Sequence, residues 1–358
     1  MTKLNVRPGV LTGKALEAVL DYCKEAQCAL PAVNVIGSHS TNAALEAARR
    51  ASSPVIIQVS NGGALFWGGK WLDNTNQAAA VAGAVACAHY CRVMAEHYGV
   101  AVILHSDHAA RKLIPWVEGM VTASEAYYAE HGEPLYSSHM LDLSEESLDD
   151  NLQISADMLT RMAKIDMTLE IELGVTGGEE DGVDNSAIDD SRLYTQPSEV
   201  LAAYDKLSPI GSFMVAASFG NTHGVYKPGN VVLRPQILKD SQEAIAAARD
   251  TAAKPVRFVF HGGSGSAPEE IAEAVSYGVV KMNIDTDTQW AFTDPIKRYM
   301  DANDGYLHAQ IGNPDGADKP NKSKIDPRGW LHAGEKGMAD RLVQAFKDLG
   351  AFGKFNVG

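Results

Sequence analysis

Cysteine and positive charge are both scarce in this sequence. Its 358 residues include only four cysteines, and 45 acidic residues against 31 lysines and arginines leave a formal net charge of −14. So few cysteines predict a protein of a reducing compartment, the cytoplasm, without a disulfide framework. The acidic balance argues against a nucleic-acid-binding surface. It does not exclude phosphorylated ligands, because these need only local positive charge or a metal ion.

Signals for membranes, for export and for several domains are missing as well. We expect no membrane span in any window, and residues 1–20 lack the apolar core of a signal peptide. The cysteines are spaced C-x4-C and C-x3-C, unlike the paired C-x2-C of zinc sites, so we interpret them as buried thiols. With 45% hydrophobic residues and no clear linker, the chain is predicted to form a single domain over residues 1–358.

Short runs rich in β-branched residues alternate with helical patterns along the chain. Eight such runs lie at 29–35, 54–60, 100–106, 137–143, 167–173, 213–219, 256–262 and 279–285. This pattern belongs to the α/β class, and eight strand–helix units over this length predict a (β/α)8 TIM barrel, with a doubly wound sheet as the alternative. Residues 1–25 predict an extra N-terminal helix. A long surface connection over 305–329 and a last helix over 335–349 would form a C-terminal helical extension.

Three histidines follow the ends of predicted strands. They are His108, His223 and His261. The C-terminal ends of parallel strands converge on one face of a barrel, which is the active face of this fold. Three neutral imidazoles meeting there would hold a Zn²⁺ ion and leave its fourth position open for a substrate. The sequence therefore predicts a catalytic metal site at this face.

Period-two alternation assigns several charged side chains to the barrel interior. Lys281, Asn283 and Asp285 share one face of their strand, and Glu170 and Glu172 share one face of theirs. Lys281 could pair with one of these carboxylates, or it could form a Schiff base with a substrate. The pairing is favoured, because a buried charge needs a partner and the histidines already supply an electrophile.

Two segments are typical of phosphate sites. HGGSGSAPEE (261–270) places glycines and serines just before a helix that begins near Pro268, and NIDTDTQW (283–290) forms the turn after the eighth strand. Backbone N–H groups at such a helix start can bind an anion, and barrel phosphate sites often follow strands seven and eight. Arg328 is a candidate for a second phosphate, with a surface arginine as the alternative.

An acidic, glycine-rich segment follows the fifth predicted strand. It covers residues 174–195 and has little periodicity. Its simplest interpretation is a solvated loop. The sharper one is a mobile lid that carries Glu179 or Glu180 as a base, since lids over barrel mouths commonly complete a site.

Long motifs of this sequence resemble those of class II fructose-bisphosphate aldolases. The motifs are HSDH (105–108), SSHMLDLSEES (137–147), TLEIELGVTGGEEDGVDN (168–185), ASFGNTHGVYKPGNVVL (217–233), FHGGSGS (260–266) and VSYGVVKMNIDTDTQWA (275–291). The resemblance runs from about residue 31 to 330, and the motifs occur in the same order as in the family. The long lid is similar to that of the dimeric type, so the resemblance implies a homodimer.

The resemblance implies how metal ions would be bound. His108, His223 and His261 would hold the catalytic Zn²⁺, while Asp142 and Glu172 match positions where a second or alternative divalent position is described. A monovalent cation, Na⁺ or K⁺, is also expected near the phosphate loop.

The resemblance further implies roles for catalytic and substrate-binding residues. Asp107 matches the residue that protonates the aldehyde oxygen in condensation and removes the hydroxyl proton in cleavage. Glu180 matches the lid carboxylate that exchanges a proton with the carbon of dihydroxyacetone phosphate, and Arg328 matches the residue that grips the other phosphate. The remaining substrate-binding positions are Asn34, Ser60, Gly224, Gly262, Gly263, Ser264, Asn283, Ile284, Asp285 and Thr286.

The chemistry fits these residues, and we predict a zinc-dependent aldolase. It would reversibly cleave D-fructose 1,6-bisphosphate to dihydroxyacetone phosphate and D-glyceraldehyde 3-phosphate, a reaction of glycolysis and gluconeogenesis. Cleavage leaves negative charge on an enediolate, which Zn²⁺ would stabilise as a Lewis acid. One carboxylate would transfer the hydroxyl proton and another the proton of the carbon. The alternative is the same reaction on the C4 epimer, tagatose bisphosphate. The phosphate loops and the paired carboxylates disfavour a barrel metallohydrolase. The complete set of acid, base and metal residues argues against a non-catalytic sugar-phosphate sensor.

Overall fold

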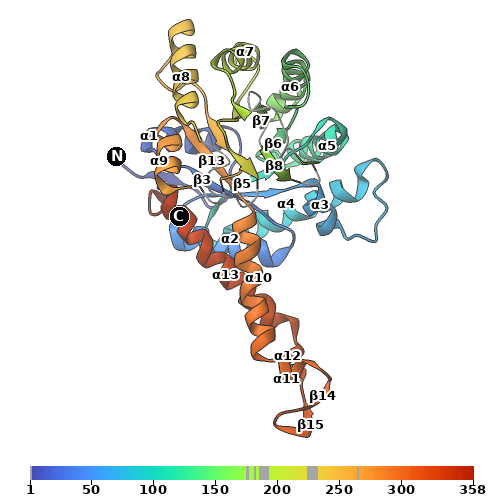
Figure 1. Ribbon diagram of the computed structural model, residues 1–358. Coiled ribbons are helices and arrows are strands. Elements are labelled where there is room, and N and C mark those ends of the chain that lie inside the picture. Colours follow the sequence, from blue (N-terminus) through green and yellow to red (C-terminus); the bar gives the residue numbers. More distant parts are fainter. Residues whose placement is uncertain (1, 175–176, 181–182, 185–192, 224–232, 264–265) are drawn as a thin grey trace.

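Eight parallel strands close into a barrel in this computed structural model (Figure 1). The structure describes residues 2–174, 177–180, 183–184, 193–223, 233–263 and 266–358, with the backbone alone at 177–180, 183–184 and 222–223. The barrel strands are β3 (Leu30–Asn34), β4 (Val55–Val59), β5 (Ala101–Ser106), β6 (Ser138–Leu141), β7 (Thr168–Leu173), β10 (Phe213–Ala217), β12 (Phe258–Phe260) and β13 (Val279–Ile284). Each lies inside one of the eight predicted runs, and the β5–β6 pairing completes the circle. The barrel prediction is therefore confirmed, and the doubly wound alternative is wrong.

Helices surround this barrel, as the alternating pattern predicts (Figure 1). They are α2 (Ser38–Ala51), α3 (Asn61–Gly68), α4 (Ala78–Tyr98), α5 (Ile114–His131), α6 (Leu148–Met162), α7 (Pro197–Leu207), α8 (Gln236–Arg249) and α9 (Pro268–Ser276). The strands β3, β4 and β5 are almost continuously apolar because both of their faces are covered, except where polar groups point into the barrel.

The N-terminal segment contains the expected extra helix, but the helix is shorter than predicted. It is α1 (Gly13–Ala26), and two short strands precede it, β1 (Leu4–Val6) and β2 (Gly9–Val10). Gly9 has a positive φ of 96°, which a helix cannot accommodate. Strand β1 pairs with β16 (Phe355–Val357), so the two ends of the chain lie side by side.

Beyond β13 the chain forms an extension that projects from the barrel (Figure 1). We call residues 286–348 the arm. Helices α10 (Thr286–Ala302) and α13 (Pro327–Asp348) pack against each other, and the far end holds α11 (Asp304–Leu307), α12 (Lys322–Ile325) and an antiparallel hairpin of β14 (Ile311–Asn313) and β15 (Gly316–Pro320).

The arm corrects two sequence predictions. The expected connection over 305–329 contains short helices and a hairpin, and the last helix begins at Pro327 rather than near 335. Asp326 caps this helix by accepting a hydrogen bond from the backbone of Arg328 at 3.0 Å. An aspartate followed by proline is a regular helix start, because proline suits the first turn.

Helix α4 corrects the prediction about membrane spans. Residues Thr75–Tyr98 are long and apolar enough to cross a membrane by length and composition, with a mean hydropathy of 1.4 over the best window. Of that window, 44% is buried inside the fold. The alanines of α4 pack between the barrel and helices α3 and α5, which accounts for its composition. All four cysteines are free and buried, which confirms the buried-thiol interpretation.

The contact between α3 and α4 depends on Gly83. A methyl group there would overlap the backbone carbonyl of Ala64, which cannot move away like a flexible side chain. We expect Gly83→Ala to destabilise the protein by about 1–3 kcal/mol or more through overpacking. Thermal unfolding measures the effect. Gly62→Ala is the matched control, because its Cβ would meet only Ser60 Oγ, at 3.9 Å; equal losses in the two variants would contradict this interpretation.

Candidate active site

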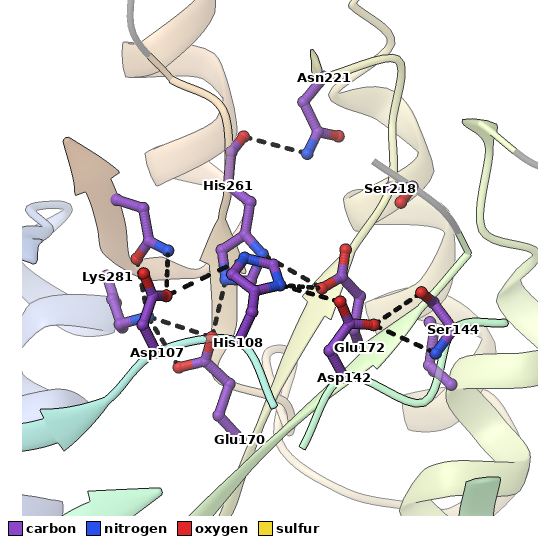
Figure 2. A network of polar contacts seen from close by, with 12 residues as sticks. Asp107, His108, Asp142, Ser144, Glu170, Glu172, Ser218, Asn221, His261 and Lys281 are labelled. Carbon is purple, nitrogen blue, oxygen red and sulfur yellow. Dashed lines mark hydrogen bonds and ion pairs between the residues drawn. The ribbon is translucent and has the colours of Figure 1, made fainter. Parts of the chain in front are cut away.

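Three side chains that could hold a metal ion gather at the C-terminal ends of the barrel strands (Figure 2). His108 follows β5, Glu172 lies on β7 and His261 follows β12, and one ligand atom of each lies within 4.8 Å of the others. Glu172 Oε2 is 3.2 Å from His108 Nδ1 and 3.4 Å from His261 Nδ1. Two imidazoles and a carboxylate form a donor set that suits Zn²⁺.

The electrostatics of this cluster favour a cation. Burial opposes the negative charge of Glu172, but His108 and His261 lower its pKa well below the ordinary value. Burial, and then His108, oppose a positive charge on His261, yet Glu172 and Glu170 together raise its pKa above the ordinary value. The buried carboxylates thus attract positive charge to this point, which a divalent ion would supply in place of protons.

Asp142 lies next to the cluster. Its Oδ2 is 3.0 Å from His108 Nδ1, and its Oδ1 accepts hydrogen bonds from the backbone and the hydroxyl of Ser144 (Figure 2). The carboxylate is therefore oriented toward the same imidazole nitrogen that faces Glu172. This arrangement is compatible with the predicted second or alternative metal position.

His223 and Glu180 are described only by their backbones. His223 ends β11 (Thr222–His223), which pairs with β8 (Gly177–Glu180) so that His223 lies opposite Gly178. Two residues before His223, the side chain of Asn221 donates to the backbone carbonyl of His261 at 3.0 Å. Two residues span at most about 7 Å, so the backbone of His223 lies within that distance of the backbone of Asn221. The pairing also brings the predicted lid segment beside His223.

The carboxylate of Asp107 is held by two asparagines. Asn34 Nδ2 donates to its Oδ2 at 2.7 Å, and Asn283 Nδ2 donates to its Oδ1 at 3.2 Å. Gln58, which the sequence did not single out, donates to Asn34 Oδ1 at 2.6 Å. Asp107 is 2% exposed, and its Oδ1 lies 4.0 Å from His108 Nε2. A fixed carboxylate beside a metal ligand can exchange a proton with a bound substrate.

The two predicted phosphate segments lie at adjacent strand ends. Gly262 has a positive φ of 59°, a conformation that favours glycine, and a side chain at Gly263 would displace the flexible end of Met282 on β13. Asp285 precedes α10, which begins at Thr286. The side chain of Ile284 is buried, and its backbone carbonyl accepts a hydrogen bond from the hydroxyl of Thr288 at 3.3 Å. Ser60 caps α3, Gly262 and Gly263 are described, and Gly224 and Ser264 lie outside the described residues.

Arg328 does not join the other site residues within one chain. Its side chain is 89% exposed and pairs with Asp326 at 2.6 Å. It lies at the start of α13, where Gly329 packs on Tyr299 of α10. Tyr299 is 13 residues beyond Thr286, which is about 20 Å along the helix axis. The structure therefore places Arg328 on the arm, away from its own barrel mouth.

Lys281 pairs with Glu170 inside the barrel, which confirms the structural interpretation of this lysine. Both side chains are fully buried, and Nζ lies 2.9 Å from Oε2. Glu170 also contacts His105, whose Nε2 lies 3.1 Å from Glu170 Oε2. The sequence indicates His105 only as part of the HSDH motif, without a role of its own.

One cavity at the barrel mouth was not foreseen. It measures about 750 Å³ and opens between Asn34 and the arm, where Phe66, Trp67, Phe292 and Leu331 line it. The apolar side chains on helices come from α3, α10 and α13, which are distant in sequence, so no single motif predicts this cavity.

Comparison with known proteins identifies the family. The family model described as fructose-bisphosphate aldolase class-II matches residues 14–354, which includes every candidate site residue. The chain belongs to the class II fructose-bisphosphate aldolase family. Zinc is the general divalent metal of these enzymes, and the cluster of His108, Glu172 and His261 is where this chain could hold it.

Relatives cover nearly the whole chain. A fructose-bisphosphate aldolase of Haemophilus influenzae is 57% identical over 346 residues, 96% of each chain. The class 2 fructose-bisphosphate aldolase of Escherichia coli is 57% identical over 348 residues, 97% of each. A crystal structure of the fructose-bisphosphate aldolase from Campylobacter jejuni is 52% identical, with a TM-score of 0.88 over 98% of this chain and 97% of the other.

Proposed function

We propose that this protein is a zinc-dependent aldolase that reversibly cleaves D-fructose 1,6-bisphosphate to dihydroxyacetone phosphate and D-glyceraldehyde 3-phosphate. The observation that carries this proposal is the cluster of His108, Glu172 and His261 beside the held carboxylate of Asp107. Membership of the class II family and full-length relatives named fructose-bisphosphate aldolase support it.

The site residues divide the chemistry among them. His108, His223 and His261 would hold Zn²⁺, with Asp142 or Glu172 at an alternative position, and the bound ion would supply Lewis acidity. Asp107 takes the proton of the C4 hydroxyl in cleavage and returns it in condensation. Glu180, on the lid segment, exchanges the proton of the carbon that becomes part of dihydroxyacetone phosphate. Two carboxylates from different elements can thus act on two different atoms.

The substrate phosphates bind at separate places in this proposal. The phosphate of dihydroxyacetone phosphate binds to backbone N–H groups of the loop 262–264 and of 283–286, with Gly224 completing the site, and Asn34 and Ser60 contact the sugar. Helix starts favour anions through their free N–H groups. A monovalent cation, Na⁺ or K⁺, would offset phosphate charge near this loop.

Arg328 is proposed to bind the second substrate phosphate in the active site of a partner subunit. It lies on the arm about 20 Å along α10 from its own barrel mouth, with its guanidinium exposed. A homodimer in which each arm reaches the other barrel would bring it to the second phosphate. Ile36 and Phe66, 54% and 53% exposed, border the apolar cavity beside the arm, as expected of an interface.

Replacing Arg328 by alanine should weaken fructose bisphosphate far more than dihydroxyacetone phosphate. The smaller ligand has no second phosphate for the guanidinium, and a charge-assisted pair of this kind contributes about 1.5–3 kcal/mol, or roughly 10–100-fold in KM. Steady-state kinetics and competitive inhibition by dihydroxyacetone phosphate measure the two effects. Equal losses for both ligands would exclude this role.

Hybrid dimers distinguish a partner's arginine from the chain's own. Subunits with Arg328→Ala keep Asp107, and subunits with Asp107→Ala keep Arg328. If the arm serves the other barrel, mixing the two variants creates one complete site per hybrid, so activity at low substrate concentration rises above that of either parent. No rise in a mixture with proven subunit exchange would show that Arg328 acts within its own chain.

The compartment, the oligomeric state and the binding partners of the enzyme follow from the same proposal. We place it in the cytoplasm as a single-domain homodimer over residues 1–358, with sugar phosphates as ligands and without nucleic-acid or membrane partners. Size-exclusion chromatography with light scattering gives the oligomeric state.

A coupled assay on the two hexose bisphosphates tests the reaction itself. The purified protein should release triose phosphate from fructose 1,6-bisphosphate much faster than from tagatose 1,6-bisphosphate. Faster release from the C4 epimer would assign it to the alternative substrate. Release of inorganic phosphate without triose phosphate would indicate a metallohydrolase.

A further inference from the structure

A fully buried ion pair lies beneath the candidate metal centre and has no part in the proposed chemistry. Lys281 Nζ on β13 is 2.9 Å and 3.1 Å from the two carboxylate oxygens of Glu170 on β7, and it donates to Asn283 Oδ1 at 2.8 Å. Burying two charges is costly, and apolar residues of similar volume often stabilise a core as well or better. Packing alone therefore does not account for Lys281.

One branch of its contacts leads to a metal ligand. Glu170 Oε1 lies 2.8 Å from His261 Nε2 (Figure 2). An ammonium can only donate, so Lys281 holds Glu170 as an acceptor, and the imidazole nitrogen that faces Glu170 carries the proton. The other nitrogen, Nδ1, then offers its lone pair on the side of Glu172, 3.4 Å away. A buried acceptor behind a histidine fixes its tautomer and ring orientation in this way.

The second branch leads to the carboxylate of Asp107. Because Lys281 donates to the oxygen of the Asn283 amide, the NH₂ group of that amide must point to the other side. There its Nδ2 donates to Asp107 Oδ1 at 3.2 Å. An asparagine can bond equally well after a flip of its amide, so the lysine selects the orientation that serves Asp107.

We propose that Lys281 is a positioning residue that sets, from one buried ammonium, both the metal-facing nitrogen of His261 and the orientation of Asp107. The proposal rests on the proposed function, in which these two residues bind Zn²⁺ and move the hydroxyl proton. One buried side chain inside the barrel would thus position both a metal ligand and the carboxylate that transfers the proton.

Zinc affinity and turnover of charge-balanced variants test this role. Lys281→Met leaves a buried carboxylate unpaired, so the double variant Lys281→Met/Glu170→Gln, which removes both charges, is made alongside it. Thr168→Val is the matched control: Thr168 is buried on the same strand as Glu170 and donates to Ser212 Oγ at 3.0 Å. Zinc dissociation constants come from competition with a chromophoric chelator, kcat and KM from fructose bisphosphate cleavage, and folding from thermal unfolding.

We expect the double variant to fold and to bind zinc about 10–100-fold more weakly than the unaltered protein, the usual effect of losing such an outer partner. Its kcat with saturating zinc should fall while KM changes little, because Asp107 is misoriented and the phosphate loops are untouched. Thr168→Val should lower only the unfolding temperature.

Three results would overturn the role of Lys281. They are unchanged zinc affinity and kcat in the double variant, an equal loss of zinc affinity in Thr168→Val, and a double variant that does not fold. The zinc measurement needs no substrate. If the unaltered protein failed to cleave fructose bisphosphate, the aldolase proposal would fall while the effect on metal binding would still be measured.

Discussion

Replacing Asp107 by alanine is expected to slow cleavage of fructose 1,6-bisphosphate by about 10²–10⁴-fold, the usual loss when a positioned acid or base is removed. Asn34 and Asn283 hold this carboxylate beside His108, so no other described group is prepared in the same way for the hydroxyl proton. Solvent hydrogen exchange into dihydroxyacetone phosphate should remain measurable, because enolisation of this three-carbon ketone does not involve the aldehyde oxygen.

Cleavage rates and isotope exchange are both measured on Asp107→Ala after its zinc content has been checked. Asp205→Ala is the control, since it removes an exposed aspartate that pairs with Arg249 on the helical surface. Loss of exchange together with cleavage, at full zinc content, would mean that Asp107 acts on the carbon rather than on the oxygen.

Replacing Glu180 by alanine is expected to have the complementary effect. Exchange of the carbon-bound proton of dihydroxyacetone phosphate should slow by about 10²–10⁴-fold with metal still bound. The backbone pairing of β8 with β11 places the segment that ends at Glu180 beside that of His223. This placement supports the proposed role of Glu180. Overall cleavage should slow as well, because release of the three-carbon product requires the same proton.

Glu179→Ala is the matched control for this prediction, because it removes the same charge from the neighbouring position. Solvent-deuterium incorporation followed by NMR separates the two variants. Unchanged exchange in Glu180→Ala with a large loss in Glu179→Ala would move the role to Glu179. If Asp107→Ala loses exchange while Glu180→Ala keeps it, the two roles are reversed.

Much of the barrel and of its active face could be predicted from local sequence patterns. All eight strands were expected, because alternation of short β-branched runs with helical patterns reflects burial within each element. Period-two alternation placed Lys281 and Glu170 inside the barrel, where they pair. Strand ends converge in this fold, so His108 and His261 could be predicted to meet although 153 positions separate them.

Contacts between elements could not be predicted in the same way. Nothing in the sequence indicates that Asn34 and Asn283 donate to Asp107, because this depends on the register of three separate strands. The position of Arg328 depends on how far α10 extends from the barrel, and the motif around it carries no information on which subunit it serves. The apolar character of α4 reflects packing that only the fold reveals.

Zinc-dependent cleavage is tested most directly by adding Zn²⁺ to chelator-treated protein while triose phosphate release from fructose 1,6-bisphosphate is followed. The protein without metal should be inactive, activity should rise linearly to about one Zn²⁺ per subunit, the stoichiometry of a single catalytic site, and borohydride with substrate should trap no lysine adduct. Full activity in the metal-free protein, or a borohydride-trapped adduct at Lys281, would contradict this mechanism.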